Sequence, residues 1–309
     1  MSDPEEPRTR DLVVAVVQME ARQAWADADA VSANAEAIGE AYVEASDRAD
    51  LVVFPELALS GYIPLKGYDQ RRKRNLASAA RRAATEELPK LADHTRGRRA
   101  ALVLGFMEPT TMRNEIHNAV ALIENGELRA VYRKMHLPVE ENHYFVPGDD
   151  VVVVDAAAGR VGLLACYDLL FPEAARIAAL RGAEVLVVPS NWLDIGNLRR
   201  LGEVLPVARA LEEQMHVVFV NGVGELGARG RRWRLYGRSL VVAATGEVVA
   251  RAGSDEETLI ATLPGSDLAA ASDVFPVLRD RRPELYGALV ESRSELSALG
   301  DLQGGEGGT

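Results

Sequence analysis

The sequence predicts an α/β protein in which two β-sheets pack face to face and helices cover their outer sides. Three observations support this fold class. Short apolar runs rich in β-branched residues recur along the chain, Ala-rich stretches with apolar residues at helical spacing separate some of them, and tight-turn dipeptides join others. A helix layer covers only one face of a sheet, so the other face needs a partner, and a second sheet supplies it.

The expected strands share a short length, few polar residues and many β-branched side chains, which is typical of strands buried on both faces. In chain order they are Leu12–Val17, Leu51–Phe54, Ala101–Gly105, Ala119–Ile123, Val151–Val154, Val161–Ala165, Val185–Val188, Val217–Val220, Leu240–Val242 and Thr258–Thr262.

Longer Ala-rich stretches place apolar residues at the spacing of one helix face, and we expect helices over Ala28–Ser46, Leu76–Thr95, Pro172–Arg181 and Arg200–Gln214. Elsewhere, neighbouring strands are joined by turn dipeptides that favour hairpins. These dipeptides are Asn125-Gly126, Ala158-Gly159 and Thr245-Gly246. The sheets should therefore mix parallel strands, joined through helices, with antiparallel neighbours.

Composition limits the classes of function. The 309-residue chain is 48% hydrophobic and 26% charged, which is ordinary usage for a protein with a sizeable core. Its formal net charge of -11 argues against binding to nucleic acid or an anionic membrane, because both attract clustered cations. The chain shows no apolar signal-peptide region near its start and no run of about 18 apolar residues, so we expect a cytoplasmic protein.

Two candidate catalytic side chains follow expected strands. The strand at Leu51–Phe54 ends on Pro55 and then presents Glu56, a carboxylate that is costly to bury unless it is used or paired. Glu56 could equally cap a helix or form a structural ion pair. Lys134 lies in the basic segment Tyr132-Arg133-Lys134-Met135-His136-Leu137, which taken alone fits a solvated turn.

The single cysteine, Cys166, lies between an expected strand and an expected helix. A thiol at a helix N-terminus has its thiolate favoured by the helix dipole and by free N–H groups, so this position predicts a pKa below the ordinary value of about 8.5. One cysteine cannot form an internal disulfide. The alternative is that Cys166 is a small buried apolar residue without a chemical role.

Taken together, these segments resemble the nitrilase superfamily, also called the carbon–nitrogen hydrolases, from about Asp11 to about Pro276. Phe54-Pro55-Glu56 resembles the base segment of that family, the segment around Lys134 its lysine segment, and Cys166-Tyr167-Asp168 its nucleophile segment, in the family's order. Further matching segments are Gly105-Phe106-Met107-Glu108, Asn118-Ala119, Pro189-Ser190-Asn191-Trp192 and Arg209-Ala210-Leu211-Glu212.

The resemblance implies a four-layer αββα sandwich that forms a homodimer or a higher homo-oligomer. It implies a hydrolase domain over residues 11–276. Composition predicts a flexible tail over residues 1–10 and an extension over 277–309 that is flexible at its Gly-rich end. The implied partner is a small-molecule amide, and no nucleic acid, membrane, cofactor or metal is expected.

The resemblance also assigns roles to residues. It implies Glu56, Lys134 and Cys166 as the catalytic set, with a second glutamate at Glu140 or Glu141. We favour Glu141, because the pattern Glu-x-x-x-Phe-x-Pro-Gly-Asp then runs through to Asp149. The implied substrate-binding residues are Tyr62, Phe145, Tyr167, Asn191 and Trp192.

The implied reaction is hydrolysis of a linear carboxamide or N-carbamoyl amine with release of ammonia. Glu56 would take the proton of Cys166, whose thiolate attacks the carbonyl. Lys134 and the backbone N–H of Tyr167 would stabilise the oxyanion. Glu56 would then protonate the departing amine and activate the water that hydrolyses the thioester.

Residues near Cys166 bear on the substrate. Relatives that act on nitriles carry Trp-Glu after the cysteine, whereas Tyr167-Asp168 is similar to the amidase and carbamoylase branches. Leu170 stands where some relatives keep a carboxylate-binding Arg, and Asp168 and Glu173 are acidic, so we expect a substrate whose distal end is neutral or cationic. Against this, the run Arg71-Arg72-Lys73-Arg74 is either a clamp for an acidic group or the solvated start of a helix.

Other functions are compatible with the same chain. A nitrilase or an amide-forming acyl transferase would use the same cysteine with a different electrophile or acceptor. A protein of another class would be an inactive homologue that serves as a scaffold or binding protein. A dinucleotide-binding enzyme is not favoured, because no G-x-G-x-x-G motif follows a strand.

Overall fold

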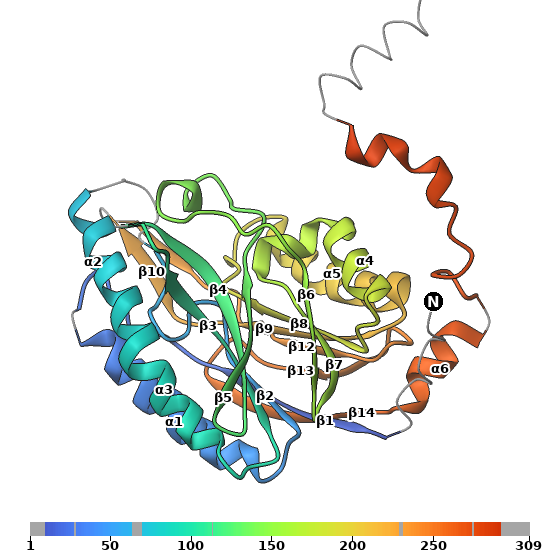
Figure 1. Ribbon diagram of the computed structural model, residues 1–309, viewed down its shortest axis with the longest axis horizontal. Helices are drawn as coiled ribbons and strands as arrows, with labels where there is room; N and C mark the ends of the chain where they lie inside the picture. The colour runs from blue at the N-terminus through green and yellow to red at the C-terminus, as the bar shows by residue number, and fades with distance from the viewer. Residues whose placement is uncertain are drawn as a thin grey trace, which may run out of the picture.

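The computed structural model describes residues 10–27, 29–63, 70–112, 114–228, 231–273 and 275–291. Two six-stranded sheets pack face to face in this part of the chain (Figure 1). The first sheet has the order β14-β1-β2-β3-β4-β5. Its strands are β1 (Leu12–Gln18), β2 (Leu51–Val53), β3 (Ala101–Pro109), β4 (Ile116–Glu124), β5 (Glu127–Arg133) and β14 (Glu257–Leu263).

The second sheet has the order β13-β12-β9-β8-β7-β6. In each sheet three parallel strands occupy the centre and antiparallel strands flank them, namely β1, β2 and β3 in the first and β7, β8 and β9 in the second. The strands of the second sheet are β6 (Val152–Ala156), β7 (Gly159–Leu163), β8 (Val185–Ser190), β9 (His216–Asn221), β12 (Leu240–Val242) and β13 (Val248–Arg251). A separate hairpin joins β10 (Glu225–Ala228) and β11 (Arg231–Arg234).

Helices cover the outer faces, so the molecule has four layers (Figure 1). The first sheet is covered by α1 (Ala30–Ser46), α2 (Gln70–Arg82), the π-helical turn η1 (Ala83–Glu87) and α3 (Leu88–Thr95). The second sheet is covered by α4 (Pro172–Leu180) and α5 (Leu198–Glu213). The remaining helical segments are η2 (Glu141–His143), η3 (Cys166–Leu170), α6 (Ser266–Asp273), η4 (Pro283–Leu285) and η5 (Gly287–Val290). No helix in the described ranges is both long and apolar enough to cross a membrane.

Alternation along each strand divides the core. In β1, Val14 and Val16 point into the layer between the sheets, whereas Ala15 and Val17 face the layer under α1 and α3. Successive side chains of a strand point to opposite faces, so a strand buried on both faces must be apolar throughout. This explains why the strands read as continuous apolar runs.

The predicted α/β fold with an αββα arrangement is confirmed, and the three expected turns each connect a hairpin. Element boundaries differ in places. The helix expected to begin at Leu76 begins at Gln70, because its first turns are polar and lack the apolar spacing that was used to find it. The strand β5 was not among the expected runs, since most of its residues are exposed or half-buried.

The expected domain boundaries at residues 11 and 276 stay predictions. Residues 1–9 and 292–309, where flexible ends were expected, lie outside the described residues. Within the expected extension, residues 277–291 are described; they include η4 and η5, in which no residue is buried.

A buried histidine should make stability depend on pH. His216 is 2% exposed, its Nδ1 accepts a hydrogen bond from the Ala244 amide, and burial lowers its pKa from 6.5 to about 4. The unfolded chain takes up this proton near pH 6.5 but the folded protein does not, so stability is fully present above that pH and falls as the pH drops toward about 4. The loss should reach about 3 kcal/mol, measured by urea unfolding across this range.

The matched variant is His216→Gln, which cannot titrate and should show a shallower loss of stability over the same pH range. If wild type and variant lost stability in parallel, another group would be responsible.

Candidate active site

Four polar or reactive side chains follow the ends of strands. Glu56 lies just beyond β2, Lys134 directly after β5, Cys166 beyond β7, and Asn191 directly after β8. The parallel strands of each sheet end at the same edge, which is where α/β proteins place their sites.

Local backbone geometry brings Glu56 close to the neighbouring strand. Gly105 in β3 donates its amide to the Pro55 carbonyl, and a Cβ atom at this glycine would lie 2.2 Å from the Leu57 nitrogen. Only a residue without a side chain allows this close approach. The Lys134 backbone is held on both sides, since its amide donates to the Asn118 carbonyl and its carbonyl accepts from the Gly148 amide.

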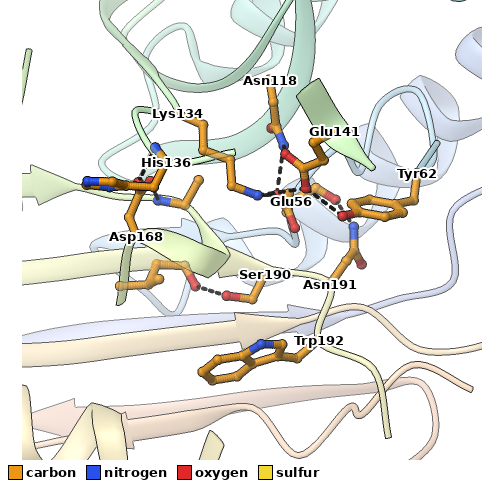
Figure 2. Close-up of polar contacts among 12 residues, drawn as sticks. Glu56, Tyr62, Asn118, Lys134, His136, Glu141, Asp168, Ser190, Asn191 and Trp192 are labelled. Carbon is orange, nitrogen blue, oxygen red and sulfur yellow. Dashed lines mark hydrogen bonds and ion pairs between the residues drawn. The ribbon is translucent and has the colours of Figure 1, made fainter. Parts of the chain in front are cut away.

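Lys134 is placed between two glutamates in the interior of the protein. Its Nζ lies 2.7 Å from Glu56 Oε1 and 2.8 Å from Glu141 Oε1. Lys134 and Glu141 are fully buried and Glu56 is 1% exposed. Figure 2 shows the three side chains converging from separate segments of the chain. Charges at this depth persist only when they are paired, so each member depends on the others.

Two further side chains donate hydrogen bonds to the glutamates. Asn118 Nδ2 donates to Glu56 Oε1 at 2.7 Å, and the Tyr62 hydroxyl donates to Glu141 Oε1 at 2.5 Å (Figure 2). Glu56 Oε2 is buried and has no hydrogen-bond partner among the described residues. This oxygen is therefore free to accept a proton from a group that enters the site.

The charges of the cluster shift the pKa values of its members. Burial alone would lower the pKa of Lys134, but the charges of Glu141 and Glu56 outweigh it and hold this pKa well above its ordinary value. Burial raises the pKa of Glu141, although Lys134 opposes the shift. Burial and the Glu141 charge raise the pKa of Tyr62 well above its usual range. At neutral pH Lys134 is an ammonium and Tyr62 a hydrogen-bond donor.

Cys166 is 5% exposed and begins the short helix η3. The expected lowering of its pKa is wrong: burial first, and the Glu56 charge second, raise the pKa of the thiol well above its ordinary value. A helix of five residues adds only a small dipole, and Lys134 and the Asn191 backbone offset only part of the rise. The resting residue is a neutral thiol that must lose its proton when it reacts.

The backbone is unusual at the nucleophile turn, which is formed by Ala165 and η3 (Cys166–Leu170). Cys166 has a φ of 45°, and Leu57, next to Glu56, has a φ of 52°. Side chains other than glycine rarely adopt this left-handed region, and residues held there concentrate at functional sites because the surroundings must impose the conformation.

The structure places the expected substrate-binding residues in different surroundings. Asn191 Nδ2 donates to the Glu56 carbonyl at 2.5 Å, and Tyr62 contacts Glu141, so both lie at the cluster. Phe145 belongs with Tyr62 to an adjoining apolar cluster. Trp192 instead packs against Phe219 and lies next to Gly202 of α5, on the face of the second sheet that this helix covers, apart from Lys134 (Figure 2).

Tyr167, the remaining residue of that set, is half-buried and meets the ring of Phe171 edge to face. The two adjacent glutamates lie in different surroundings. Glu141 is buried against Lys134, whereas Glu140 is half-buried and precedes the first residue of η2.

Asp168 and Glu173, the acidic residues expected to favour a cationic substrate, do not lie beside Lys134 and Glu56. Asp168 is fully buried and accepts hydrogen bonds from Tyr132, His136 and Ala165, and Glu173 is exposed in the first turn of α4. This part of the substrate argument is wrong, because proximity in sequence to Cys166 did not place either side chain against Lys134 and Glu56.

The basic run 71–74 lies in the first turns of α2, as one of its two interpretations held. Arg71 and Arg74 are exposed, and the guanidinium of Arg72 lies 5.2 Å from the centre of the Trp25 ring, a cation–π contact.

Asn118 was missed as a site residue. It was noted only as part of a matching segment, yet an amide in the middle of the apolar strand β4 was a usable signal, because a buried polar side chain requires partners. Within the described ranges, no group of three or more His, Cys, Asp or Glu side chains is arranged to hold a metal ion.

The family profile for carbon-nitrogen hydrolases matches residues 13–273. The chain belongs to the carbon-nitrogen hydrolase family. An (R)-stereoselective amidase from a Pseudomonas species is 37% identical over 243 residues, which span 78% of this chain and 83% of that protein. The predicted membership of the nitrilase superfamily is thereby confirmed.

Solved structures of carbon-nitrogen hydrolases and amidases have a similar fold. A carbon-nitrogen hydrolase from Helicobacter pylori G27 superposes with a TM-score of 0.78 at 27% identity, over 92% of this chain and 99% of that one. A variant of the amidase from Nesterenkonia sp. AN1 superposes with a TM-score of 0.72 at 28% identity, over 91% and 97% of the two chains. That structure shows covalent addition of the acetamide moiety of fluoroacetamide at the active site cysteine of that amidase. This carbon-nitrogen hydrolase is an amidase-type enzyme.

Proposed function

We propose that the protein hydrolyses a linear carboxamide or N-carbamoyl amine and releases ammonia through a thioester on Cys166. The observation that carries this proposal is the buried Lys134 ammonium held by Glu56 and Glu141 while Glu56 Oε2 has no partner among the described residues. The Glu56 and Lys134 charges act directly on the Cys166 thiol.

Acylation begins with a proton transfer. The thiol of Cys166 is neutral at rest, and the unpartnered Oε2 of Glu56 accepts its proton as sulfur attacks the amide carbon. The carbonyl oxygen becomes an oxyanion, which the Lys134 ammonium and the Tyr167 amide stabilise. Protonated Glu56 returns the proton to the nitrogen, the carbon–nitrogen bond breaks, and ammonia leaves.

Deacylation repeats these roles with water. Glu56 takes a proton from the water that attacks the thioester, and the restored proton on sulfur completes the cycle. One carboxylate therefore serves both half-reactions. Glu141 has a different role. Because its Oε1 already binds Lys134 and Tyr62, it holds the ammonium in place.

The charge of the cluster favours substrates without a carboxylate. Two carboxyl groups and one ammonium surround the reacting centre, so the site is net negative when both carboxyls are ionised. In a buried site such repulsion is weakly screened. The adjoining cluster that includes Tyr62, Phe145 and Ile116 is apolar, which suits a hydrocarbon chain.

This proposal predicts a substrate order that depends on charge. Pentanamide, 4-aminobutanamide and glutaramate share three methylenes after the carbonyl and end in methyl, ammonium and carboxylate. We expect kcat/KM for ammonia release to be about tenfold or more higher for the first two, which corresponds to roughly 1.4 kcal/mol of repulsion.

The control replaces Arg71, Arg72, Lys73 and Arg74 together with Gln and should leave the order unchanged. A preference for glutaramate that this variant abolished would make the basic run a carboxylate clamp. Ammonia release from pentanenitrile at a rate similar to pentanamide would instead indicate a nitrilase.

A further inference from the structure

Asp168 joins the two segments that carry Cys166 and Lys134. Its buried carboxylate accepts the Ala165 amide at 3.1 Å and the Tyr132 hydroxyl at 2.6 Å. It also accepts the His136 amide at 2.9 Å and lies 2.8 Å from His136 Nδ1. One side chain thus ties together partners that are more than thirty positions apart in the sequence.

These partners bracket the catalytic residues. Tyr132 and His136 stand two positions before and after Lys134, and Ala165 immediately precedes Cys166. Tyr132 and His136 are therefore both bound to the carboxylate of Asp168, which also binds the Ala165 amide next to Cys166. Figure 2 shows Asp168 and His136 on the side of Lys134 opposite Tyr62.

The connection is reinforced by packing and burial. The ring of His136 stacks on Phe171 with centroids 3.7 Å apart and planes 8° from parallel, and Phe171 directly follows the nucleophile turn. Asp168 and Tyr132 are fully buried. Charge-assisted hydrogen bonds in such surroundings are strong and hold their geometry.

The nucleophile turn needs such support. The left-handed φ of Cys166 is unfavourable for a non-glycine residue. Asp168 closes the turn twice, since its amide donates to the Ala165 carbonyl at 3.0 Å and its carboxylate accepts the Ala165 amide. The same residue therefore holds Cys166 in its conformation and holds Lys134 at a set distance from it.

We propose that Asp168 is a positioning residue that aligns the Cys166 sulfur with the Lys134 ammonium for attack on the amide. The inference rests on the proposed catalytic roles of Cys166 and Lys134. Asp168 touches neither substrate nor sulfur in this scheme. It acts by keeping the nucleophile and the group that stabilises the oxyanion in register, and displacement of reacting groups by about 1 Å costs about 100-fold in rate.

The test separates alignment from stability. Asp168→Asn puts an amide donor against several donors, and Tyr132→Phe removes one bond to the carboxylate. Matched controls lie at a distance. Asp50 is 2% exposed and accepts from Arg10 and the Val13 amide, and the fully buried Tyr42 donates to the Ala100 carbonyl. Asp50→Asn and Tyr42→Phe therefore remove comparable buried groups far from Cys166.

All variants are assayed for ammonia release well below the melting temperature of the least stable one. We expect kcat to fall about 100-fold for Asp168→Asn and about tenfold for Tyr132→Phe, with KM changed less than about threefold. Both controls should lower the melting temperature yet keep kcat within about twofold. In the Asp168 and Tyr132 variants, the rate of Cys166 alkylation by iodoacetamide should fall much less than kcat does. Alkylation needs the thiol of Cys166 but not its alignment with Lys134.

Two outcomes overturn the inference. In the first, the Asp168 and Tyr132 variants keep wild-type kcat while they lose stability. In the second, kcat falls as much in the Asp50 and Tyr42 controls as in the Asp168 and Tyr132 variants. Failure of the proposed function gives a different result: Cys166→Ala or Lys134→Met would then remain active whatever the Asp168 variants show.

Discussion

Replacing Cys166 with alanine is expected to lower kcat for amide hydrolysis by about 10,000-fold or more, the size of loss seen when a covalent nucleophile is removed. Cys166 is the single cysteine of the chain, so no neighbouring thiol can take over. The residue is small and 5% exposed, and alanine leaves only the volume of one sulfur atom unfilled. The fold should persist, and the near-complete loss should lie in the chemical step.

The serine variant should be nearly as inactive. The pKa of the Cys166 thiol is already raised by burial and by Glu56, and a hydroxyl is a far weaker acid, so Glu56 could not generate the alkoxide. Activity near the wild-type level in Cys166→Ser would count decisively against the proposed nucleophile.

Intact-mass spectrometry provides the measurement, because one cysteine gives one possible adduct. Iodoacetamide should add a single carbamidomethyl group to the wild type, and a slow amide substrate should protect against it. The same substrate should leave an acyl adduct on the wild type and none on Cys166→Ala. Near-ultraviolet circular dichroism of both proteins controls for folding.

The fold could be predicted from the sequence because apolar runs report burial directly. Strands such as β1 and β8 are buried along almost all of their length, and their shortness and β-branched content distinguish such apolar runs from buried helix segments. The strand β5 escaped prediction for the opposite reason, since it lies at the edge of its sheet and exposes several residues. Helix limits were missed where the first turns lack apolar residues at helical spacing, as at the polar start of α2.

The site was predictable only in part. Motif order indicated Glu56, Lys134 and Cys166, but not that Lys134 would lie within 2.8 Å of two carboxylates. The position of Asp168 shows the limit: its sequence neighbours suggested a substrate contact, whereas its partners Tyr132 and His136 come from another segment. The pKa of Cys166 was misjudged because a strand-to-helix junction says nothing about burial.

Glu56→Gln is the second change with a large expected effect, and it should lower kcat by about 1,000-fold or more, because general base and acid roles are both lost. The glutamine oxygen can still accept from Lys134 and Asn118, so the cluster should stay assembled. The amide nitrogen would then occupy the place of Oε2, the oxygen without a partner, and cannot take the thiol proton. Near wild-type steady-state rates in this variant would show that the base is another group.

A nitrophenyl ester separates the two half-reactions, because its leaving group departs without a proton. Glu56→Gln should release one equivalent of nitrophenolate slowly, because Cys166 must ionise without its base, and should then stall as an acyl-enzyme, since the water that resolves the thioester also lacks its base. Glu141→Gln is the matched control, because Glu141 binds Lys134 and Tyr62 but takes no part in proton transfer in the proposed mechanism. It should lose about 10- to 100-fold in both half-reactions without accumulating the acyl-enzyme. Accumulation in Glu141→Gln and not in Glu56→Gln would exchange the two assignments.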